Sequence, residues 1–227
     1  MSIATPPELF VSRDPAVEIG SLLAQHATRG GTIVLTGGST PGRAYELAAE
    51  LEPDWSAVSL WWSDERCVPP DDERSNYKLA NEHLLSRLRV RPHAIQRIRG
   101  ELPPGVAADE YDQALTGVAL DFVLLGLGSD GHMASLFPGS PQLKVRDKRA
   151  TDGPAGLEPF VHRVTLTLPT IRSAARIAFL VTGEDKADAV AAAFGGDVSP
   201  DVPASLTRLS QVPVEVYLDE AAAAKIE

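Results

Sequence analysis

Short apolar runs alternate with amphipathic segments along this chain, and the two patterns predict strands and helices in turn. Strands are expected at 32–36, 58–62, 122–125, 177–182 and 214–218, and helices at 17–27, 43–51, 75–88 and 106–115. Repeated alternation of strand and helix favours a parallel sheet whose strands are joined by crossover helices. The sequence therefore predicts an α/β fold.

The remaining segments are less regular. Residues 163–168 alternate apolar and polar positions, which indicates a strand away from the centre of the sheet. An alanine-rich helix is expected after 183–186 and a short helix at 220–225. Loops rich in proline, glycine and charge are expected at 67–74, 138–158 and 195–203. The loop at 138–158 is interpreted as either a lid or a surface excursion.

Composition narrows the class of protein. The 227 residues are 44% hydrophobic and 23% charged, as is ordinary for one soluble globular domain. The formal net charge of -10 argues against a nucleic-acid partner, and an anionic substrate then needs a local basic pocket. The single cysteine, Cys67, excludes an intramolecular disulfide. With neither a signal peptide nor a membrane-length apolar run visible, we expect a cytoplasmic protein with no membrane partner.

The most informative stretch is residues 121–132. The apolar run at 122–125 is typical of a strand buried on both faces, and glycines at 126, 128 and 131 then permit a sharp turn. Asp130 and His132 follow at the carboxyl edge of the sheet, where open α/β folds bind ligands. His132 is the best candidate base, and Asp130 is placed to fix its tautomer if the turn brings the two together.

The same glycines spell the dinucleotide-binding pattern G-x-G-x-x-G. That motif requires a long helix directly after the turn, because the pyrophosphate lies at the helix N-terminus. Here Pro138 and Gly139 stop any helix after six residues. Nucleotide binding is therefore not favoured. Metal-ligand spacing is also missing from the sequence, so neither a metal nor another cofactor is expected.

Several other residues are candidates for binding an anion. Gly38, Ser39 and Thr40 lie between a predicted strand and a predicted helix, where they surround an anion or serve as an ordinary capped turn. Asp64 and Arg66 follow another strand, and Arg66 is able to hold a phosphate. Arg163 and Lys186, at the ends of further strands, are placed to reach the same ligand, although each alone is typical of a solvated surface.

The chain resembles the 6-phosphogluconolactonase family in four segments that occur in the family's order and spacing. These are Thr-Gly-Gly-Ser-Thr-Pro at 36–41, Ser-Asp-Glu-Arg at 63–66 with Ser-Asn at 75–76, Leu-Gly-Leu-Gly-Ser-Asp-Gly-His at 125–132 continuing to Ser-Leu-Phe-Pro-Gly at 135–139, and Arg-Val-Thr-Leu-Thr at 163–167 with Thr-Gly-Glu-Asp-Lys at 182–186. The resemblance implies a Rossmann-like three-layer sandwich with a mainly parallel central sheet flanked by helices. It also implies one domain over residues 1–227.

By the same resemblance, the expected reaction is hydrolysis of 6-phospho-D-glucono-1,5-lactone in the oxidative pentose phosphate pathway. His132 is implied as the general base with Asp130 as its support. The residues implied to lie near the substrate and its phosphate are Gly38, Ser39, Thr40, Asp64, Arg66, Arg163 and Lys186. The expected partner is a phosphorylated sugar lactone, and we expect a monomer or at most a weak dimer.

Two alternatives stay open at this stage. The first is a glucosamine-6-phosphate deaminase-type isomerase, in which Asp64 would transfer the C2 proton. Such relatives tend to carry Asn-Gly-His, whereas this chain has Asp-Gly-His at 130–132. The second is a sensor of sugar phosphates without catalytic activity, because a fold does not determine a function.

Overall fold

The computed structural model describes residues 4–38 and 40–226. Its strands are β1 (Glu8–Val11), β2 (Gly31–Leu35), β3 (Val58–Trp62), β4 (Asp64–Arg66), β5 (Ala94–Gln96), β6 (Phe122–Leu125), β7 (Ala150–Gly153), β8 (Arg163–Leu166), β9 (Ile177–Val181) and β10 (Val214–Leu218). Its α-helices are α1 (Pro15–Arg29), α2 (Pro41–Leu51), α3 (Asn76–Ala80), α4 (Pro104–Ala114), α5 (Leu168–Arg172) and α6 (Ala187–Val190). The 3-10 helices are η2 (Pro141–Lys144), η3 (Glu184–Lys186) and η5 (Pro203–Leu209), and π-helical turns η1 (Asn81–Leu85) and η4 (Ala191–Gly195) extend α3 and α6.

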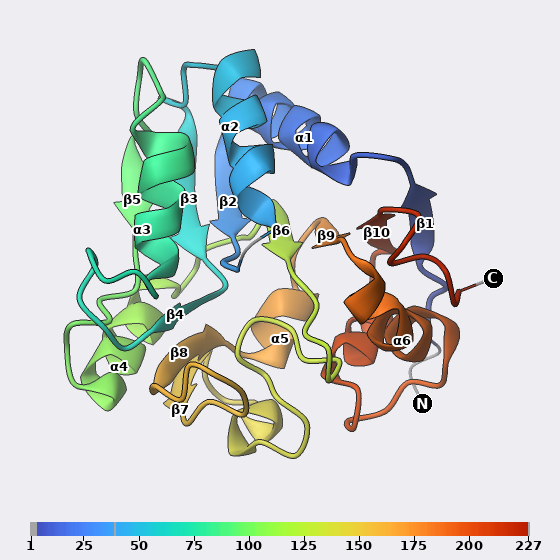
Figure 1. The fold of residues 1–227 in the computed structure, drawn as a ribbon. Helices are drawn as coiled ribbons and strands as arrows, with labels where there is room; N and C mark the ends of the chain where they lie inside the picture. The colour runs from blue at the N-terminus through green and yellow to red at the C-terminus, as the bar shows by residue number, and fades with distance from the viewer. Residues whose placement is uncertain (1–3, 39, 227) are drawn as a thin grey trace.

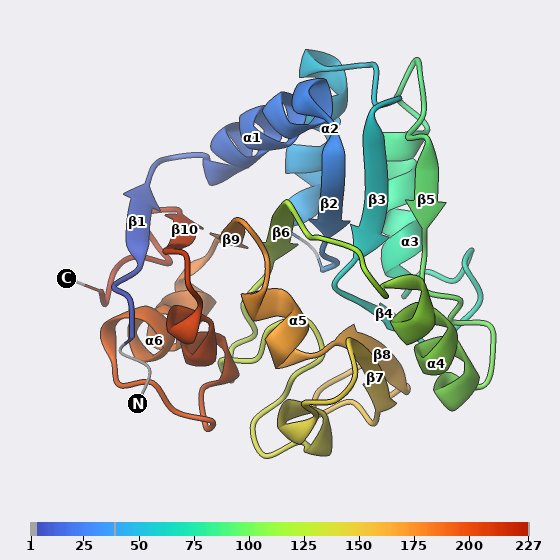
Figure 2. The same cartoon turned by 180° about the vertical axis from the view of Figure 1, so that it is seen from behind.

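The central sheet is parallel throughout the described residues. Its order is β1-β10-β9-β6-β2-β3-β5, and each neighbouring pair runs in the same direction. Helices α1, α2 and α3 cover one face of β2, β3 and β5, as Figure 1 and the reverse view in Figure 2 show. The predicted α/β fold with a mainly parallel sheet flanked by helices is confirmed.

Two adjacent tryptophans at the end of β3 show how the layers are held. Trp62 packs against Tyr77 of α3, and Trp61 packs against Tyr111 of α4, with 5.6 Å between ring centroids in both pairs. Successive side chains of a strand point to opposite faces, so these two helices cover opposite sides of β3. The Tyr111 hydroxyl also accepts from the Trp62 amide at 2.9 Å and donates to the Trp62 carbonyl at 2.8 Å.

Helix α1 forms because its apolar residues recur on one face. Ile19, Leu23 and Ala27 are spaced four apart and are all buried, which fixes the helix on the sheet. Asp14 directly precedes this helix, but its side chain makes no capping hydrogen bond. It pairs instead with Arg43 of α2 at 2.7 Å, because the guanidinium offers a charged donor.

A second, smaller sheet lies beyond the carboxyl ends of the central strands. Its order is β4-β8-β7, and its pairs are antiparallel. The strand expected at 163–168, away from the centre of the sheet, forms as β8 over Arg163–Leu166, but it belongs to this second sheet rather than to the central one. Strand β7 and the 3-10 helix η2 fall inside the loop expected at 138–158, so that segment is partly structured. The helix expected at 220–225 is wrong: the chain forms turns there, with the Ala223 amide donating to the Asp219 carbonyl at 3.0 Å.

Helices long and apolar enough to cross a bilayer are not found in the described part of the chain.

Candidate functional site

A cavity of about 240 Å³ opens at the carboxyl end of the central sheet. The chain builds the sheet outward from β2 to β5 and then returns to build it the other way from β6, so the strand order reverses between β2 and β6. Loops diverge at such a reversal and leave a crevice that binds ligands. The segments after β2, β6 and β9 line this cavity, together with residues from β4 and β8.

His132 lines the cavity and forms a close pair with Asp130, which is not itself a lining residue. The Nδ1 atom of His132 lies 2.5 Å from Oδ1 of Asp130, and the His132 amide donates to the same oxygen at 3.1 Å. Burial acts to raise the pKa of Asp130, but the hydrogen bonds and charge of His132 outweigh it and lower that pKa below its usual range. An ionised carboxylate only accepts, so Nδ1 carries the proton and Nε2 is left as the basic nitrogen.

Gly128 explains why this turn is rich in glycine. A Cβ atom on Gly128 would lie 2.0 Å from Nδ1 of His132 and 2.8 Å from Oδ1 of Asp130, so the pair packs directly against the glycine backbone. The Gly128 amide donates to the His132 carbonyl at 2.9 Å, which closes the turn. The glycine therefore leaves room for the imidazole in its observed place.

The imidazole is held from another side by Phe137. The two rings pack at a tilt of 40°, with centroids 4.4 Å apart. The Gly131 amide donates to the Gly128 carbonyl at 2.9 Å, and residues 133–140, directly after this turn, form no helix. The dinucleotide-binding interpretation, already disfavoured by sequence, therefore lacks its required helix. The amides of Gly128 and Gly131 both serve the turn itself and are not free to bind a ligand oxygen.

The loop that begins α2 forms one end of the cavity. Gly38 has a φ of +96°, a left-handed conformation that glycine adopts without strain. Thr40 lines the cavity, and its side chain makes no capping hydrogen bond to the helix. The alternative of an ordinary hydroxyl cap therefore fails for Thr40. Ser39, expected in the same role, lies outside the described residues.

Asp64 lines the cavity, although most of its side chain is buried, and it joins three segments. Its Oδ2 accepts from the Ser135 hydroxyl at 2.6 Å, and its Oδ1 accepts from the Asn76 amide group at 3.1 Å and the Ser63 hydroxyl at 3.3 Å. Asp64 is only 5% exposed. Both carboxylate oxygens are thus engaged by protein donors, and through Ser135 they fix the segment that follows His132.

The neighbouring acid, Glu65, has a structural task. Its carboxylate accepts from the amides of Asn76 and Tyr77 at 2.7 and 2.8 Å and from the Ser75 hydroxyl at 3.0 Å, at the first turn of α3. Burial raises the pKa of Glu65, although these hydrogen bonds counteract the rise. The Ser75 hydroxyl accepts from the Lys78 amide at 3.1 Å and so caps helix α3.

Arg66 and Arg163 face each other across the pairing of β4 with β8. Arg163 is 4% exposed, and its guanidinium donates to the carbonyls of Pro159 and Val161 at 2.9 and 3.2 Å. Burial lowers the pKa of Arg163, the negative charge of Asp64 raises it, and the positive charge of Arg66 lowers it by less. Asp64 thus compensates part of the charge of Arg163, while the two guanidiniums, opposite each other on paired strands, repel each other.

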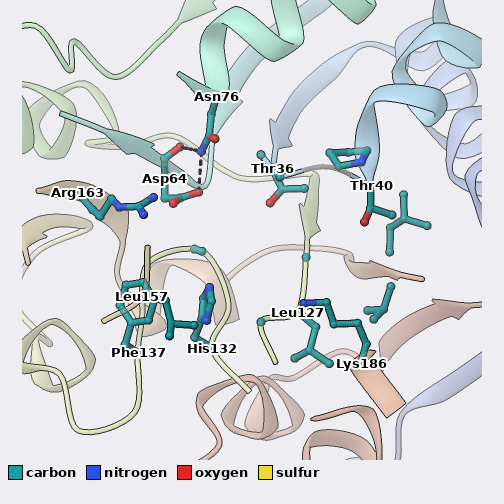
Figure 3. Close-up of a pocket in the computed structure, with 18 of the residues that line it drawn as sticks. Thr36, Thr40, Asp64, Asn76, Leu127, His132, Phe137, Leu157, Arg163 and Lys186 are labelled. Atoms are coloured by element: carbon teal, nitrogen blue, oxygen red, sulfur yellow. Dashed lines mark hydrogen bonds between the residues drawn. The ribbon is translucent and has the colours of Figure 1, made fainter. Parts of the chain in front are cut away.

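Lys186 lines the opposite end of the cavity. Figure 3 shows Arg163 beside Asp64 at one end, Lys186 and Thr40 at the other, and His132 on the wall between them in this view. Lys186 Nζ lies 3.5 Å from a carboxylate oxygen of the neighbouring Asp185. The predicted site residues among those described therefore gather around one cavity, but their cations divide between its two ends.

The cavity also contains residues that the sequence reasoning missed as site residues. Among them are Thr36, Asn76, Phe137 and Leu157. The side-chain amide of Asn76 donates to Asp64, while its buried Oδ1 has no hydrogen-bond partner in the described chain. That oxygen is suited to accept from a ligand hydroxyl. Phe137 and Leu157 supply apolar wall, and neither carries a chemical group that would mark it as a site residue in the sequence.

Replacing Asp130 by asparagine tests the pairing. We expect kcat for hydrolysis of 6-phospho-D-glucono-1,5-lactone, the reaction expected from the sequence, to fall about tenfold. The asparagine side chain offers Nδ1 either a donor or a weaker acceptor, so the imidazole is held less firmly in its position. KM should change little, since Asp130 faces the histidine. Steady-state kinetics against Asp201→Asn, an exposed acid outside this cavity, provide the measurement and control. Equal kinetics for the two variants would contradict a role for the pair.

The parallel α/β fold and the histidine–aspartate pair at a cavity with cationic side chains are typical of an α/β enzyme that acts on an anionic ligand. Comparison with known proteins gives its family. The family model described as glucosamine-6-phosphate isomerases/6-phosphogluconolactonase matches residues 15–216. A probable 6-phosphogluconolactonase 1 of Arabidopsis thaliana is 36% identical over 217 residues, covering 86% of this chain and 81% of the relative. A 6-phosphogluconolactonase of a Nostoc strain is 37% identical over 209 residues, covering 86% and 84%. The chain belongs to the glucosamine-6-phosphate isomerase/6-phosphogluconolactonase family.

Solved structures agree with this assignment. The 6-phosphogluconolactonase from Trypanosoma cruzi superposes with a TM-score of 0.85 at 26% identity, covering 99% of this chain and 98% of the other. A monomeric glucosamine-6-phosphate deaminase superposes with a TM-score of 0.86 at 21% identity, covering 96% and 99%. The second likeness shows the shared fold alone.

Proposed function

We propose that this protein hydrolyses 6-phospho-D-glucono-1,5-lactone to 6-phospho-D-gluconate. The observation that carries the proposal is the His132–Asp130 pair, 2.5 Å apart, on the wall of a cavity with cationic side chains at both ends. Membership of the family and identities of 36% and 37% to proteins named as 6-phosphogluconolactonases support it. We further propose that residues 1–227 act as one domain, because both sheets contribute to the site.

In the proposed mechanism, His132 is the general base. Its Nε2 takes a proton from a water molecule, and the hydroxide formed adds to the C1 carbonyl carbon of the lactone. Asp130 stabilises the imidazolium that results. The tetrahedral intermediate then breaks the bond between C1 and the ring oxygen, and the imidazolium returns its proton to that oxygen. The reaction adds one water molecule and transfers no electrons.

We assign the phosphate of the substrate to the end of the cavity formed by Gly38, Thr40 and Lys186. A helix of eleven residues begins at this loop, so its partial positive charge adds to that of the lysine. With the phosphate held there, C1 of the substrate lies near His132. The substrate then loses little additional translational and rotational freedom on reaching the transition state.

Arg66 and Arg163 were expected beside the phosphate, but they enter the cavity at its other end. We propose that their positive charge stabilises the oxyanion that develops at C1 and the carboxylate of the product. The amides of Gly128 and Gly131 are engaged within the turn and are not available for this role. Asp64 stays within this proposal as a positioning residue, because its oxygens are already paired.

The direct test measures hydrolysis above the spontaneous rate for 6-phosphogluconolactone and for D-glucono-1,5-lactone, which lacks the phosphate. A much higher kcat/KM is expected for the phosphorylated lactone. Equal values for the two substrates, or no rate above the spontaneous one, would contradict the proposed function.

Replacing Lys186 by methionine should raise KM for the phosphorylated lactone about tenfold, because a hydrogen bond to a charged group is lost. The rate on the unphosphorylated lactone should stay the same, since that substrate never used the lysine. Lys148→Met removes an exposed lysine that pairs with Asp109 and serves as the matched control. A similar loss on both lactones would show that Lys186 does not hold the phosphate.

The deaminase alternative is not favoured by the geometry. Its C2 proton transfer would need a carboxylate free to act on the sugar, but Asp64 is buried and both of its oxygens are paired. Incubation with glucosamine 6-phosphate should release no ammonia. A sensor without activity is disfavoured by the intact His132–Asp130 pair, which binding alone would not require.

A further inference from the structure

A second cavity, of about 420 Å³, lies outside the site described above. Its walls come from the segment after His132, from η2, from α5 and from residues 200–209, and it shares no lining residue with the first cavity among the described residues. Segment 126–140 contributes to both cavities. In Figures 1 and 2 these elements gather below the carboxyl ends of the central strands.

The second cavity combines an apolar lining with positive charge. Leucine side chains supply the apolar part: Leu143, Leu168, Leu206 and Leu209. Lys144, Arg146 and Arg172 supply the charge. Asp201 is an acid on the same lining, and its carboxylate accepts from the Ser199 hydroxyl at 3.4 Å. The cations therefore exceed the acids around this space.

These cations have no acidic partner. Within residues 4–38 and 40–226, neither Lys144, Arg146 nor Arg172 forms a salt bridge. Arg146 donates to the carbonyls of Leu143 and Val145 at 2.7 and 2.9 Å, and Arg172 donates to the Leu209 carbonyl. Neutral acceptors thus hold both guanidiniums in place and leave their charges uncompensated.

Two further observations favour the binding of an anion in this cavity. Burial lowers the pKa of Arg172, and the charge of Arg146 lowers it further, so the two guanidiniums repel each other. The Nε atom of Arg172 and the hydroxyl of Ser140, both on lining residues, are buried without a hydrogen-bond partner in the described chain. Clustered cations with unused donors are the arrangement that binds phosphate groups in proteins.

We propose that this second cavity binds a small phosphorylated molecule that also carries an apolar group. The phosphate lies between Lys144, Arg146 and Arg172, and the apolar group covers the leucine side chains. The ligand contacts the same segment that carries His132. The backbone amide of Ser140, at the edge of the cavity, donates to the Phe137 carbonyl at 3.1 Å, and the Phe137 ring packs at a tilt against the His132 ring.

The cavity's other wall also reaches the catalytic turn. The Ala204 amide of η5 donates to the Gly131 carbonyl at 2.9 Å, and the Val202 side chain occupies the space where a Cβ of Gly131 would lie. Two segments that line the second cavity therefore also contact the turn that ends at His132. One carries Phe137, and the other carries Val202 and Ala204.

Phenyl phosphate is a suitable probe, because it has one phosphate, one apolar ring and no sugar. Its affinity should be measured by calorimetry on the wild-type protein and on Arg66→Gln/Lys186→Met, in which the first cavity has lost cations from both ends. Binding is expected in both proteins. Lys144→Gln/Arg146→Gln, which changes two exposed side chains, should weaken it at least about tenfold.

Arg89→Gln/Arg91→Gln is the matched control, since it removes two exposed cations elsewhere and should leave the affinity unchanged. Inorganic phosphate should bind about tenfold more weakly than phenyl phosphate, because it buries no apolar surface. Loss of binding in Arg66→Gln/Lys186→Met would place the probe in the first cavity and overturn the proposal. Unchanged affinity in Lys144→Gln/Arg146→Gln, or equal affinity for inorganic phosphate, would overturn it as well. None of these readouts depends on lactone hydrolysis.

Discussion

Replacement of His132 by alanine should lower kcat for 6-phosphogluconolactone by about 10²–10⁴-fold, the usual contribution of a positioned general base. Nδ1 of the His132 ring is engaged by Asp130 at 2.5 Å, so Nε2 is the nitrogen that remains free to accept a proton. Without it, water must add to the lactone unassisted. Stopped-flow or coupled assays at neutral pH, corrected for spontaneous hydrolysis, give the measurement.

Binding separates a catalytic role from a structural one. The affinity of His132→Ala for 6-phosphogluconate should stay close to that of the wild type, because the proposed phosphate contacts at Thr40 and Lys186 are intact. His162→Ala removes an exposed histidine that also pairs with an aspartate, Asp152 at 3.1 Å, and should leave kcat unchanged. Full activity in His132→Ala would exclude the proposed mechanism.

The second large effect is expected for Gly128→Ala. The added methyl group would lie 2.0 Å from Nδ1 of His132, far inside van der Waals contact, so the imidazole must move. Displacement of a catalytic group by about 1 Å costs about 10²-fold in rate, and we expect a loss of that size in kcat. The global fold should persist, because Gly128 has a negative φ that alanine adopts and the clash is confined to the turn.

Gly105→Ala is the control for this variant. Gly105 lies in the first turn of α4, and a Cβ there meets no atom within 4 Å. Its activity should match the wild type, and its thermal stability should be equal or slightly higher. Should Gly128→Ala keep full activity while its crystal structure shows an unmoved imidazole, the close packing would have no functional consequence.

The central strands were predictable because burial on both faces leaves a continuous apolar run. Residues 58–62, 122–125 and 214–218 were predicted with the bounds that the structure has. Strands β1, β4, β5 and β7 were not predicted, since each has only three or four residues, and β4 and β7 are also largely polar, as in Asp64–Arg66. Their pairing comes from tertiary neighbours, which a local pattern does not contain.

The same limit applies to the site. His132, Asp130 and the glycines of their turn share one short segment, so their chemistry was visible in the sequence. The division of cations between the two ends of the cavity was not, because Arg66 and Arg163 meet through an antiparallel pairing of strands nearly a hundred residues apart in the chain. The roles of Asp64 and Asn76 depended likewise on which donors surround them once folded.

Arg163 is tethered to main-chain carbonyls of the loop before its own strand. The position of the guanidinium therefore depends on the conformation of that loop, so neither Arg163 nor the loop can be redesigned without affecting the other. A lysine at 163 would carry the charge but would lack the planar guanidinium that donates to the carbonyls of Pro159 and Val161 at the same time. Lengthening or shortening residues 154–161 would likewise move the guanidinium, so an engineer who alters this loop also alters which lactones fit.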